Sequence, residues 1–362
     1  MDNSRFEVSI TLHPSEAGRI DEVSVKSYKS LNLILTTLLT RVYSALWWEK
    51  VDVSGERESE RVFCHSPVMV KEVVSWLVPP ASTSVCDGTV GQGGHAEAIL
   101  DAMGGVLIGV DRDEEALAIC RKRLSRFGER AVLAKGLFVD LPLHLNRAGF
   151  QCTDGVLLDL GVSSRQLDDS KRGFSFQSDG PLDMRMDQSS GRTAADLVNS
   201  LPESELADLI YEYGEERFSR RIARAIVQRR LDHLLGTTQE LVTVIKDVVP
   251  AAYRNGRIHC ATRTFQALRI AVNRELETLE AALRGMVSIL RPGGRIAVIS
   301  FHSLEDRIVK HTFRALSTGG DMRLKVLTKK PHLPTDEERR LNPRARSAKL
   351  RVAECVSQES LQ

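Results

Sequence analysis

Segments with the pattern of buried strands alternate with helical segments between residues 68 and 160. Helices are predicted over 68–77, 96–103 and 114–126, and strands over 84–86, 106–110, 131–134 and 155–160. Strands that alternate with helices form parallel sheets with helices on both faces. The sequence therefore predicts an α/β fold built on a doubly wound, Rossmann-like sheet.

The alternation stops after residue 162 and resumes near the end of the chain. Residues 163 to about 258 have a helical, strongly charged pattern without strands, which predicts an inserted helical subdomain. One helix is expected over 264–289, followed by the turn RPGGR and a strand over 296–300. Two late strands, 323–327 and 348–352, are expected to close the edge of the sheet.

These patterns divide the chain into five parts. They are an extension of unknown role (1–62), the first part of the sheet domain (63–162), the helical insertion (163–260), the second part of the sheet domain (261–356) and a tail (357–362). Within the extension, the apolar stretch from Leu31 to Trp48 includes Arg41 and repeats at helical spacing. It predicts a short amphipathic helix and not a membrane span.

A glycine-rich turn, DGTVGQGGH at 87–95, separates the first strand from a helix. Glycines at such a turn let bare backbone approach a ligand closely. Asp111 ends the next strand, twenty positions after Gly91, where a carboxylate can accept hydrogen bonds from ribose hydroxyls. Together they predict a site for a nucleotide-like cofactor. The glycines alone would also fit a tight strand-to-helix turn that binds no ligand.

Two features of this turn distinguish between cofactors. Its glycines miss the G-x-G-x-x-G spacing that places a pyrophosphate on a helix N-terminus. Asp87 would repel a pyrophosphate, whereas it could help to hold the cationic amino-acid end of S-adenosylmethionine, directly or through water. The charge therefore favours a methyltransferase over a dehydrogenase.

The fourth strand ends in the block LLDLGVSS (157–164), which contains Asp159. Ligands of open α/β sheets bind beyond the carboxyl ends of the strands, although a turn or cap role would also explain an aspartate there. Transfer of a methyl group to an amine needs alignment and an acceptor for the leaving proton. We expect Asp159, Ser163 and Ser164 to form the catalytic pocket, without a metal.

A second polar group follows the strand over 296–300. It comprises His302, Ser303, Glu305 and Asp306. These residues either face the same crevice or form a capping arrangement, with Ser303 at the start of a helix and acids in its first turn.

Several long blocks resemble those of the MraW family of bacterial small-subunit ribosomal RNA methyltransferases H. They include GGH (93–95), DRD (111–113), LLDLGVSS (157–164), YGEERFSRRIARAIV (213–227), TRTFQALRIAVNREL (262–276), SFHSLEDRIVK (300–310) and NPRARSAKLRVAE (342–354). The resemblance runs from His65 to Glu354. It implies N4-methylation of a cytidine in the decoding region of 16S ribosomal RNA, with S-adenosylmethionine as donor, by a methyltransferase core interrupted by a substrate-recognition domain.

The resemblance also implies which residues contact the cofactor. They are Gly93, Gly94, His95, Asp111, Phe138, Asp159 and Gln166. The chain departs from the family pattern at Val90, where Phe or Leu is usual, and at Arg165, where Pro is usual. The stretch before Cys64 has no counterpart in the family.

Charge is nearly balanced, with 50 Lys and Arg against 48 Asp and Glu, so RNA contacts must come from local basic clusters. Arg217, Arg220, Arg221 and Arg224 share one helical face. Residues 321–351 add ten Lys and Arg against four Asp and Glu. These clusters predict an RNA-binding surface, although such runs are ordinarily just solvated.

Six scattered cysteines without a CxxC pair predict a reducing, cytoplasmic location and no structural zinc. The expected partner is small-subunit ribosomal RNA or the assembled subunit, with no membrane; the sequence leaves a homodimer open. A DNA amino-methyltransferase is the nearest rival, but Asp-Leu-Gly replaces its (D/N/S)PP(Y/F/W) motif. The other rival is an RNA-binding assembly factor without turnover.

Overall fold

The computed structural model describes residues 67–78, 82–318 and 323–356. The chain divides into two compact units, and every described residue belongs to the second, Cys64–Gln362. The predictions for the extension and for the tail lie outside the described residues.

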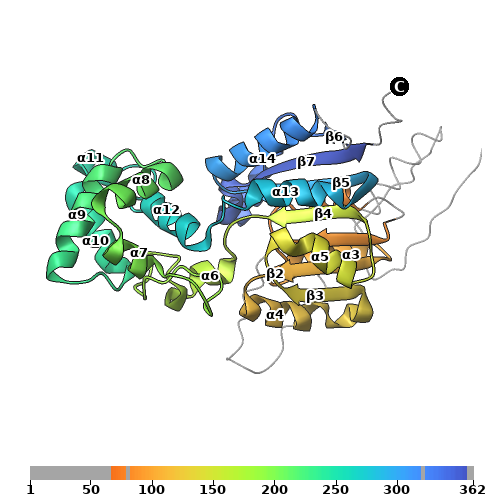
Figure 1. The fold of residues 1–362 in the computed structure, drawn as a ribbon, viewed down its shortest axis with the longest axis horizontal. Helices are drawn as coiled ribbons and strands as arrows, with labels where there is room; N and C mark the ends of the chain where they lie inside the picture. The colour runs from red at the N-terminus through yellow and green to blue at the C-terminus, as the bar shows by residue number, and fades with distance from the viewer. Residues whose placement is uncertain (1–66, 79–81, 319–322, 357–362) are drawn as a thin grey trace, which may run out of the picture. The chain divides into compact units, whose positions relative to one another are not determined.

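Seven strands form one sheet in the order β3-β2-β1-β4-β5-β7-β6 (Figure 1). They are β1 (Ser84–Asp87), β2 (Val106–Asp111), β3 (Ala131–Lys135), β4 (Thr153–Asp159), β5 (Leu290–Ser300), β6 (Arg323–Val326) and β7 (Lys349–Val356). The first five strands pair in parallel, as predicted. Strand β7 runs antiparallel to both of its neighbours, so the two late strands make the sheet mixed at this edge.

Helices cover both faces of the sheet, which confirms the doubly wound architecture. One face carries α2 (Val70–Leu77), α3 (Gly94–Ala102) and α4 (Glu114–Leu124), and the other carries α5 (Leu141–Arg147), α13 (Leu279–Ser288) and α14 (Ser303–Leu316). Successive strand residues, such as Val85 and Cys86, face opposite layers and are fully buried. The sheet thus sits between two apolar layers.

The segment between β4 and α13 is helical and has its own apolar core. Its helices are α6 (Ser164–Asp168), α7 (Ala194–Ser200), α8 (Glu203–Gly214), α9 (Ser219–Asp232), α10 (Thr238–Val248), α11 (Ala251–Arg254) and α12 (Thr262–Asn273). Figure 1 shows α7 to α12 gathered into one group. Phe265 and Leu268 of α12 belong to this core, so α12 packs with the insert and not with the sheet.

The prediction of a single helix over 264–289 is wrong, because the helix is interrupted between α12, which ends at Asn273, and α13, which begins at Leu279. Arg274 adopts the left-handed conformation, with φ of 52°. Buried Asn273 holds the break: its side-chain oxygen accepts from Met186 N at 2.8 Å, and its amide nitrogen donates to Met184 O at 2.7 Å. These partners are about ninety residues away, so the local pattern could not reveal the break.

A short segment joins β6 to β7 and contains α15 (Asp336–Leu341) and the 3-10 helix η5 (Pro343–Ser347). The cysteines described by the structure are all free. In the described ranges, none of the helices has the length and apolarity that crossing a bilayer requires.

Candidate functional site

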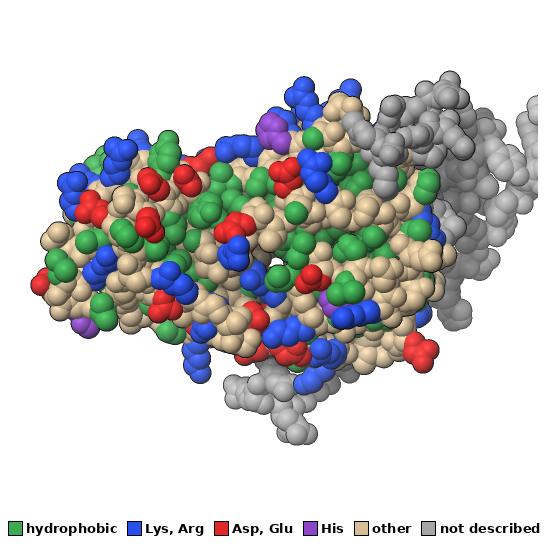
Figure 2. All heavy atoms as spheres, viewed as in Figure 1, with side chains coloured by type: hydrophobic (Ala, Val, Ile, Leu, Met, Phe, Trp, Pro, Cys, Tyr) green, Lys and Arg blue, Asp and Glu red, His purple; other side chains and the backbone are tan. Residues whose placement is uncertain are grey.

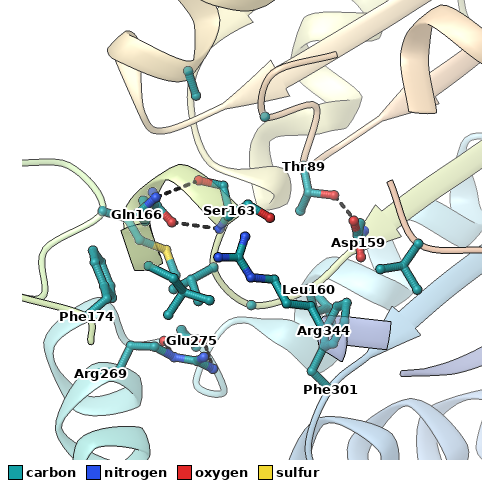
Figure 3. A pocket seen from close by; sticks show the side chains of 18 of the residues that line it. Thr89, Asp159, Leu160, Ser163, Gln166, Phe174, Arg269, Glu275, Phe301 and Arg344 are labelled. Carbon is teal, nitrogen blue, oxygen red and sulfur yellow. Dashed lines mark hydrogen bonds and ion pairs between the residues drawn. The ribbon is translucent and has the colours of Figure 1, made fainter. Parts of the chain in front are cut away.

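A cavity of about 590 Å³ lies at the carboxyl ends of β1, β2, β4 and β5. The sheet order reverses between β1 and β4, and such a switch point is where ligands of open α/β sheets bind. The insert and the segment before β7 supply further walls, including Phe174, Arg269 and Arg344 (Figure 3). The cavity therefore joins the sheet domain to the insert.

The glycine-rich turn forms one wall and is packed too closely for side chains. A Cβ on Gly88 would lie 2.7 Å from Leu158 Cδ2. Gly91 and Gly93 have φ of 51° and 83°, and a Cβ on Gly93 would lie 2.8 Å from Cys120 Sγ. Glycine is required here both for conformation and for close approach.

Asp111 ties the turn to the end of β2. Its Oδ2 accepts from Gly91 N at 2.8 Å and its Oδ1 accepts from Asp113 N at 2.9 Å. Burial raises the pKa of Asp111, although these two hydrogen bonds oppose the shift. The carboxylate lines the cavity and keeps lone pairs for a further donor.

Asp87 differs from the expectation that it faces the cofactor. It is buried, it does not line the cavity, and its Oδ1 accepts from Thr89 N at 3.0 Å. Burial raises the pKa of Asp87 to about 7. Its carboxylate organises the turn from behind.

His95 and Asp159 face each other across the cavity wall. His95 Nε2 lies 2.8 Å from Val68 O, and because a carbonyl only accepts, this nitrogen carries the proton. Burial lowers the pKa of His95, so the ring is neutral and its Nδ1, 3.6 Å from Asp159 Oδ2, has a lone pair. The tautomer of His95 is therefore fixed by Val68.

The carboxyl group of Asp159 is prepared to exchange a proton. Its backbone N donates to Thr89 Oγ1 at 2.6 Å, which fixes the end of β4 (Figure 3). Its Oδ1 is buried and has no hydrogen-bond partner among the described residues. Burial, and then the charge of Glu305, raise the pKa of Asp159 to about 7. A carboxyl with that pKa ionises near neutral pH.

Ser163 and Gln166 form a capping box at the start of α6. Ser163 Oγ accepts from Gln166 N at 3.3 Å, and Gln166 Oε1 accepts from Ser163 N at 2.9 Å. Gln166 Nε2 donates to Asp113 Oδ2 at 2.8 Å, and Arg172 Nη1 donates to the same oxygen at 3.1 Å. Asp113 thereby connects the end of β2 to the insert.

A charged group lies on the side of the cavity formed by α12 and α14. Arg269 donates two 3.0 Å hydrogen bonds to the carboxylate of Glu275. Glu305 Oε1 lies 3.1 Å from His302 Nε2, and Glu305 Oε2 accepts from Phe301 N at 2.9 Å. Burial opposes ionisation, but His302 and then Arg269 lower the pKa of Glu305. Its charge therefore acts on Asp159.

His302, and not Ser303, caps α14. The cap and cavity-lining interpretations of this block both hold for His302 and Glu305, because both residues also line the cavity. Ligand atoms of Glu275, His302 and Glu305 lie within 4.8 Å of one another, the only such group in the described ranges. Their oxygens are already engaged by Arg269, by His302 and by backbone N–H groups, so the group carries no metal assignment.

Aromatic rings line the cavity, Phe174 and Phe176 from the insert and Phe301 from the end of β5. Phe176 stacks on His259 with ring centroids 4.6 Å apart and meets Phe265 edge-on at 5.0 Å. Phe174, Phe176 and Phe301 all contribute to the lining. Such rings offer faces on which a planar base can stack.

Residues 62–356 match the MraW methylase family. The chain belongs to the MraW methylase family. Proteins named "Ribosomal RNA small subunit methyltransferase H" from Pelobacter propionicus and Geotalea uraniireducens are each 52% identical to this methylase, over 81% of its chain and 98% and 99% of theirs. Membership makes the chain an S-adenosylmethionine-dependent methyltransferase.

Solved structures are much more distant from this methylase. A "putative rRNA-methylase" from Clostridium thermocellum is 14% identical, with a TM-score of 0.38, and covers 79% of this chain and 95% of its own. A "putative methyltransferase from streptococcus mutans in complex with SAH" is 11% identical, with a TM-score of 0.37, and covers 79% of this chain and 95% of its own. At these scores the likeness carries no argument about the site.

The structure brings most of the predicted site residues of the methylase to the cavity. The residues that line it are Gly94, His95, Asp111, Phe138, Asp159, Ser163, Ser164 and Gln166. Gly93 does not line it, because it packs against Cys120 and its N–H donates to Val90 O at 2.8 Å. The roles of these residues in catalysis and donor binding stay predictions.

Sequence reasoning missed several lining residues of the methylase, among them Thr89, Arg269, Glu275 and Arg344. All four lie inside quoted blocks or the glycine-rich turn, but only three-dimensional packing singles them out. The structure accommodates the two positions at which the sequence departs from the family pattern. Val90 is buried beside Gly109, and Arg165 lies on α6 with its Nη2 3.6 Å from Glu115 Oε2.

The predicted arginine face belongs to α9 only in part, because Arg217 precedes this helix, which begins at Ser219. Arg220, Arg221 and Arg224 are exposed, but Arg224 pairs with Glu203 at 3.3 Å and the Arg217 guanidinium lies over the ring of Tyr253. On the face drawn in Figure 2, Lys and Arg side chains alternate with Asp and Glu and form no uniform basic patch.

Proposed function

We propose that this methylase transfers a methyl group from S-adenosylmethionine to N4 of a cytidine in the decoding region of 16S ribosomal RNA. One observation carries the proposal: the same cavity combines the glycine-rich turn, aromatic rings and the carboxyl group of Asp159, whose pKa is raised to about 7 by burial and by the charge of Glu305. The name of these relatives supports small-subunit ribosomal RNA as the acceptor class. The N4 position follows from the family resemblance.

The residues present fit the donor. The turn at Gly88 has no room for a side chain, and Asp111 lines the cavity at the end of β2, where ribose hydroxyls can donate to it. We propose that Gly94, His95, Asp111, Phe138 and Gln166 hold the donor, with Phe138 beside the adenine and Gly93 shaping the turn. When bound, the donor supplies an electrophilic methyl group on a sulfonium.

Asp159 is proposed to accept the proton that leaves N4. The lone pair of a cytosine amine is conjugated with the ring, so an acceptor on its N–H favours the reactive, pyramidal amine. The Asp159 side chain is 26% exposed although Oδ1 is buried, so Oδ2 is proposed as the oxygen that accepts from N4. Ser164, at the start of α6, and the hydroxyl proton of Ser163 are proposed to orient the base.

The insert is proposed as the RNA-recognition subdomain, from about 163 to the end of α12 at Asn273 and not to 260 as expected from the sequence, because α12 packs in the core of the insert. Its aromatic residues at the cavity suit a base that has been extruded from the RNA, which costs least in single-stranded or irregular regions. The exposed arginines of α9 and the basic segment before β7 would contact phosphates, so RNA affinity should fall as salt rises.

The test is methyl transfer with tritiated donor to 16S RNA, to assembled small subunits and to DNA. We expect label in one of the two RNA acceptors and N4-methylcytidine in its nucleoside digest by mass spectrometry. Label on DNA, or a different methylated nucleoside, would contradict the proposal. Donor binding without transfer to any acceptor would support the non-catalytic assembly factor.

Replacing Asp111 with Ala is expected to weaken binding of S-adenosylhomocysteine about 10- to 100-fold, measured by calorimetry. The variant loses the proposed ribose acceptor as well as the partner of Gly91 N, and a hydrogen bond to a charged group contributes roughly 1.5–3 kcal/mol. Asp101→Ala, which removes an exposed acid of α3, is the control. Equal affinities of both variants would remove Asp111 from the donor site.

A further inference from the structure

Arg344 enters the cavity from a part of the chain to which the proposed mechanism gives no role. It belongs to η5, and Asn342, Pro343, Arg344 and Ser347 all line the cavity. Figure 3 shows the Arg344 side chain pointing into the cavity towards Ser163. The Arg344 guanidinium thus lies in the cavity that the glycine-rich turn and the insert also line.

The backbone that carries Arg344 is well fixed. Asn342 Oδ1 accepts from Arg344 N at 3.2 Å, and Pro343 stands in the first turn of η5. Ala345 and Ala348 are fully buried, and β7 begins at Lys349. The guanidinium is therefore offered from a rigid base, which is what a ligand-positioning residue needs.

The guanidinium of Arg344 is held by a carboxylate at the end of α6. Arg344 Nη2 donates to Asp168 Oδ1 at 2.5 Å, and Asp168 is the last residue of α6. The Asp168 side chain is 53% exposed and that of Arg344 is 30% exposed. Ion pairs with this exposure contribute little to stability, so a competing anion can replace the carboxylate.

A phosphodiester is well suited to replace it. Guanidinium groups bind carboxylates and phosphates with the same planar, charge-assisted hydrogen bonds. Arg165, Lys171 and Arg346, close in sequence to one or other partner, are exposed as well. Because the Asp168 side chain is exposed, an anion that displaces it must approach from solvent. This favours an RNA phosphate over the carboxylate of the donor as the anion that binds Arg344.

We propose that Arg344 is a positioning residue that binds a backbone phosphate of the RNA at the cavity, and that Asp168 occupies its guanidinium until RNA displaces it. This inference rests on the proposed function for the identity of the acceptor. It predicts opposite effects for the two partners: loss of Arg344 weakens RNA binding, whereas loss of the Asp168 charge strengthens it.

The experiment measures binding of the full chain to an in vitro 16S RNA transcript by filter binding at several salt concentrations. The variants are Arg344→Gln, Asp168→Asn and, as a matched control, Arg284→Gln. Arg284 is also an exposed arginine in an ion pair, 2.8 Å from Glu280, but it does not line the cavity. Calorimetry with S-adenosylhomocysteine measures donor affinity for each variant.

We expect Arg344→Gln to weaken RNA binding about tenfold and to reduce the slope of log K against log salt by about one. Asp168→Asn should tighten RNA binding roughly threefold, and Arg284→Gln should change neither affinity nor slope appreciably, because a single distant surface charge contributes little. Donor affinity should stay within about twofold for all three, since the donor contacts lie elsewhere.

Several results would overturn the inference. If Arg344→Gln loses donor affinity and keeps RNA affinity, the guanidinium serves the carboxylate of the donor. If Asp168→Asn weakens RNA binding, Asp168 holds Arg344 in place and does not compete with phosphate. If the wild-type protein methylates RNA and Arg344→Gln binds RNA normally, only this inference is refuted. If the wild-type protein binds RNA but does not methylate it, only the proposed function is refuted. Wild-type protein that binds neither the transcript nor assembled small subunits refutes both.

Discussion

Replacing Asp159 with Asn is expected to lower kcat for methyl transfer about 10²- to 10⁴-fold, the range over which a general base contributes. The amide has the shape of the carboxyl group but cannot take the proton from N4. Because the backbone N–H of Asp159 still donates to Thr89, the end of β4 should keep its position, and affinity for S-adenosylhomocysteine should fall less than tenfold. Single-turnover kinetics with 16S RNA and calorimetry measure the two quantities.

Asp140→Asn provides the matched control, because Asp140 is an exposed carboxylate that does not line the cavity. The pH dependence gives a second readout. Burial and the charge of Glu305 raise the pKa of Asp159 to about 7, so its base form increases with pH and the wild-type rate should rise through about pH 7 before levelling. A full rate for Asp159→Asn, or the same pH limb in that variant, would contradict the assignment.

Replacing Arg172 with Met is expected to lower the free energy of unfolding by about 3–5 kcal/mol, the cost of breaking a buried ion pair from one side. The Arg172 and Asp113 side chains are only 4% and 6% exposed. Arg172 Nη2 also donates to Arg185 O at 3.1 Å and to Met186 O at 2.9 Å. The variant would leave a buried carboxylate, the buried carbonyl of Met186 and the partly buried carbonyl of Arg185 without this partner.

Urea denaturation followed by circular dichroism measures this loss. Arg224→Met is the control, since Arg224 is 72% exposed in its pair with Glu203 and such pairs contribute about 1 kcal/mol or less. A change below about 1 kcal/mol for Arg172→Met would mean that the connection between the sheet and the insert depends on apolar packing alone.

Local pattern was enough to predict the sheet. The strand predicted over 106–110 is observed at Val106–Asp111, and the late strand predicted over 323–327 is observed at Arg323–Val326. Apolar runs bounded by turn residues carry this information within a few positions. The antiparallel direction of β7 was not contained in the pattern, because it depends on how the segment before it returns across the sheet.

Helix α5 shows a different limit. It has seven residues, Pro142 stands in its first turn, and only Leu141 and Leu145 are buried at helical spacing. Two apolar positions do not establish a helical period. Its formation depends on the apolar layer that covers one face of the sheet, which no local window contains.

The candidate site was predictable where residues follow strands directly. Asp111 and Asp159 end β2 and β4, and the carboxyl ends of parallel strands meet at one edge. Asp87 also ends a strand, yet it lies behind the turn, because the direction of a side chain at the last strand position depends on the register of the pleat. Arg344 could not be predicted, since its partner Asp168 lies 176 residues earlier.

The left-handed break at Arg274 determines where the insert could be separated from the rest of the protein. Residues 164–260 alone would omit α12, and the core of the excised piece would lose Phe265 and Leu268. A fragment that begins at Ser164 and ends at Asn273 keeps that core whole and ends where the chain already changes direction. The same break makes 274–278 the natural junction for grafting a different recognition module onto this catalytic sheet.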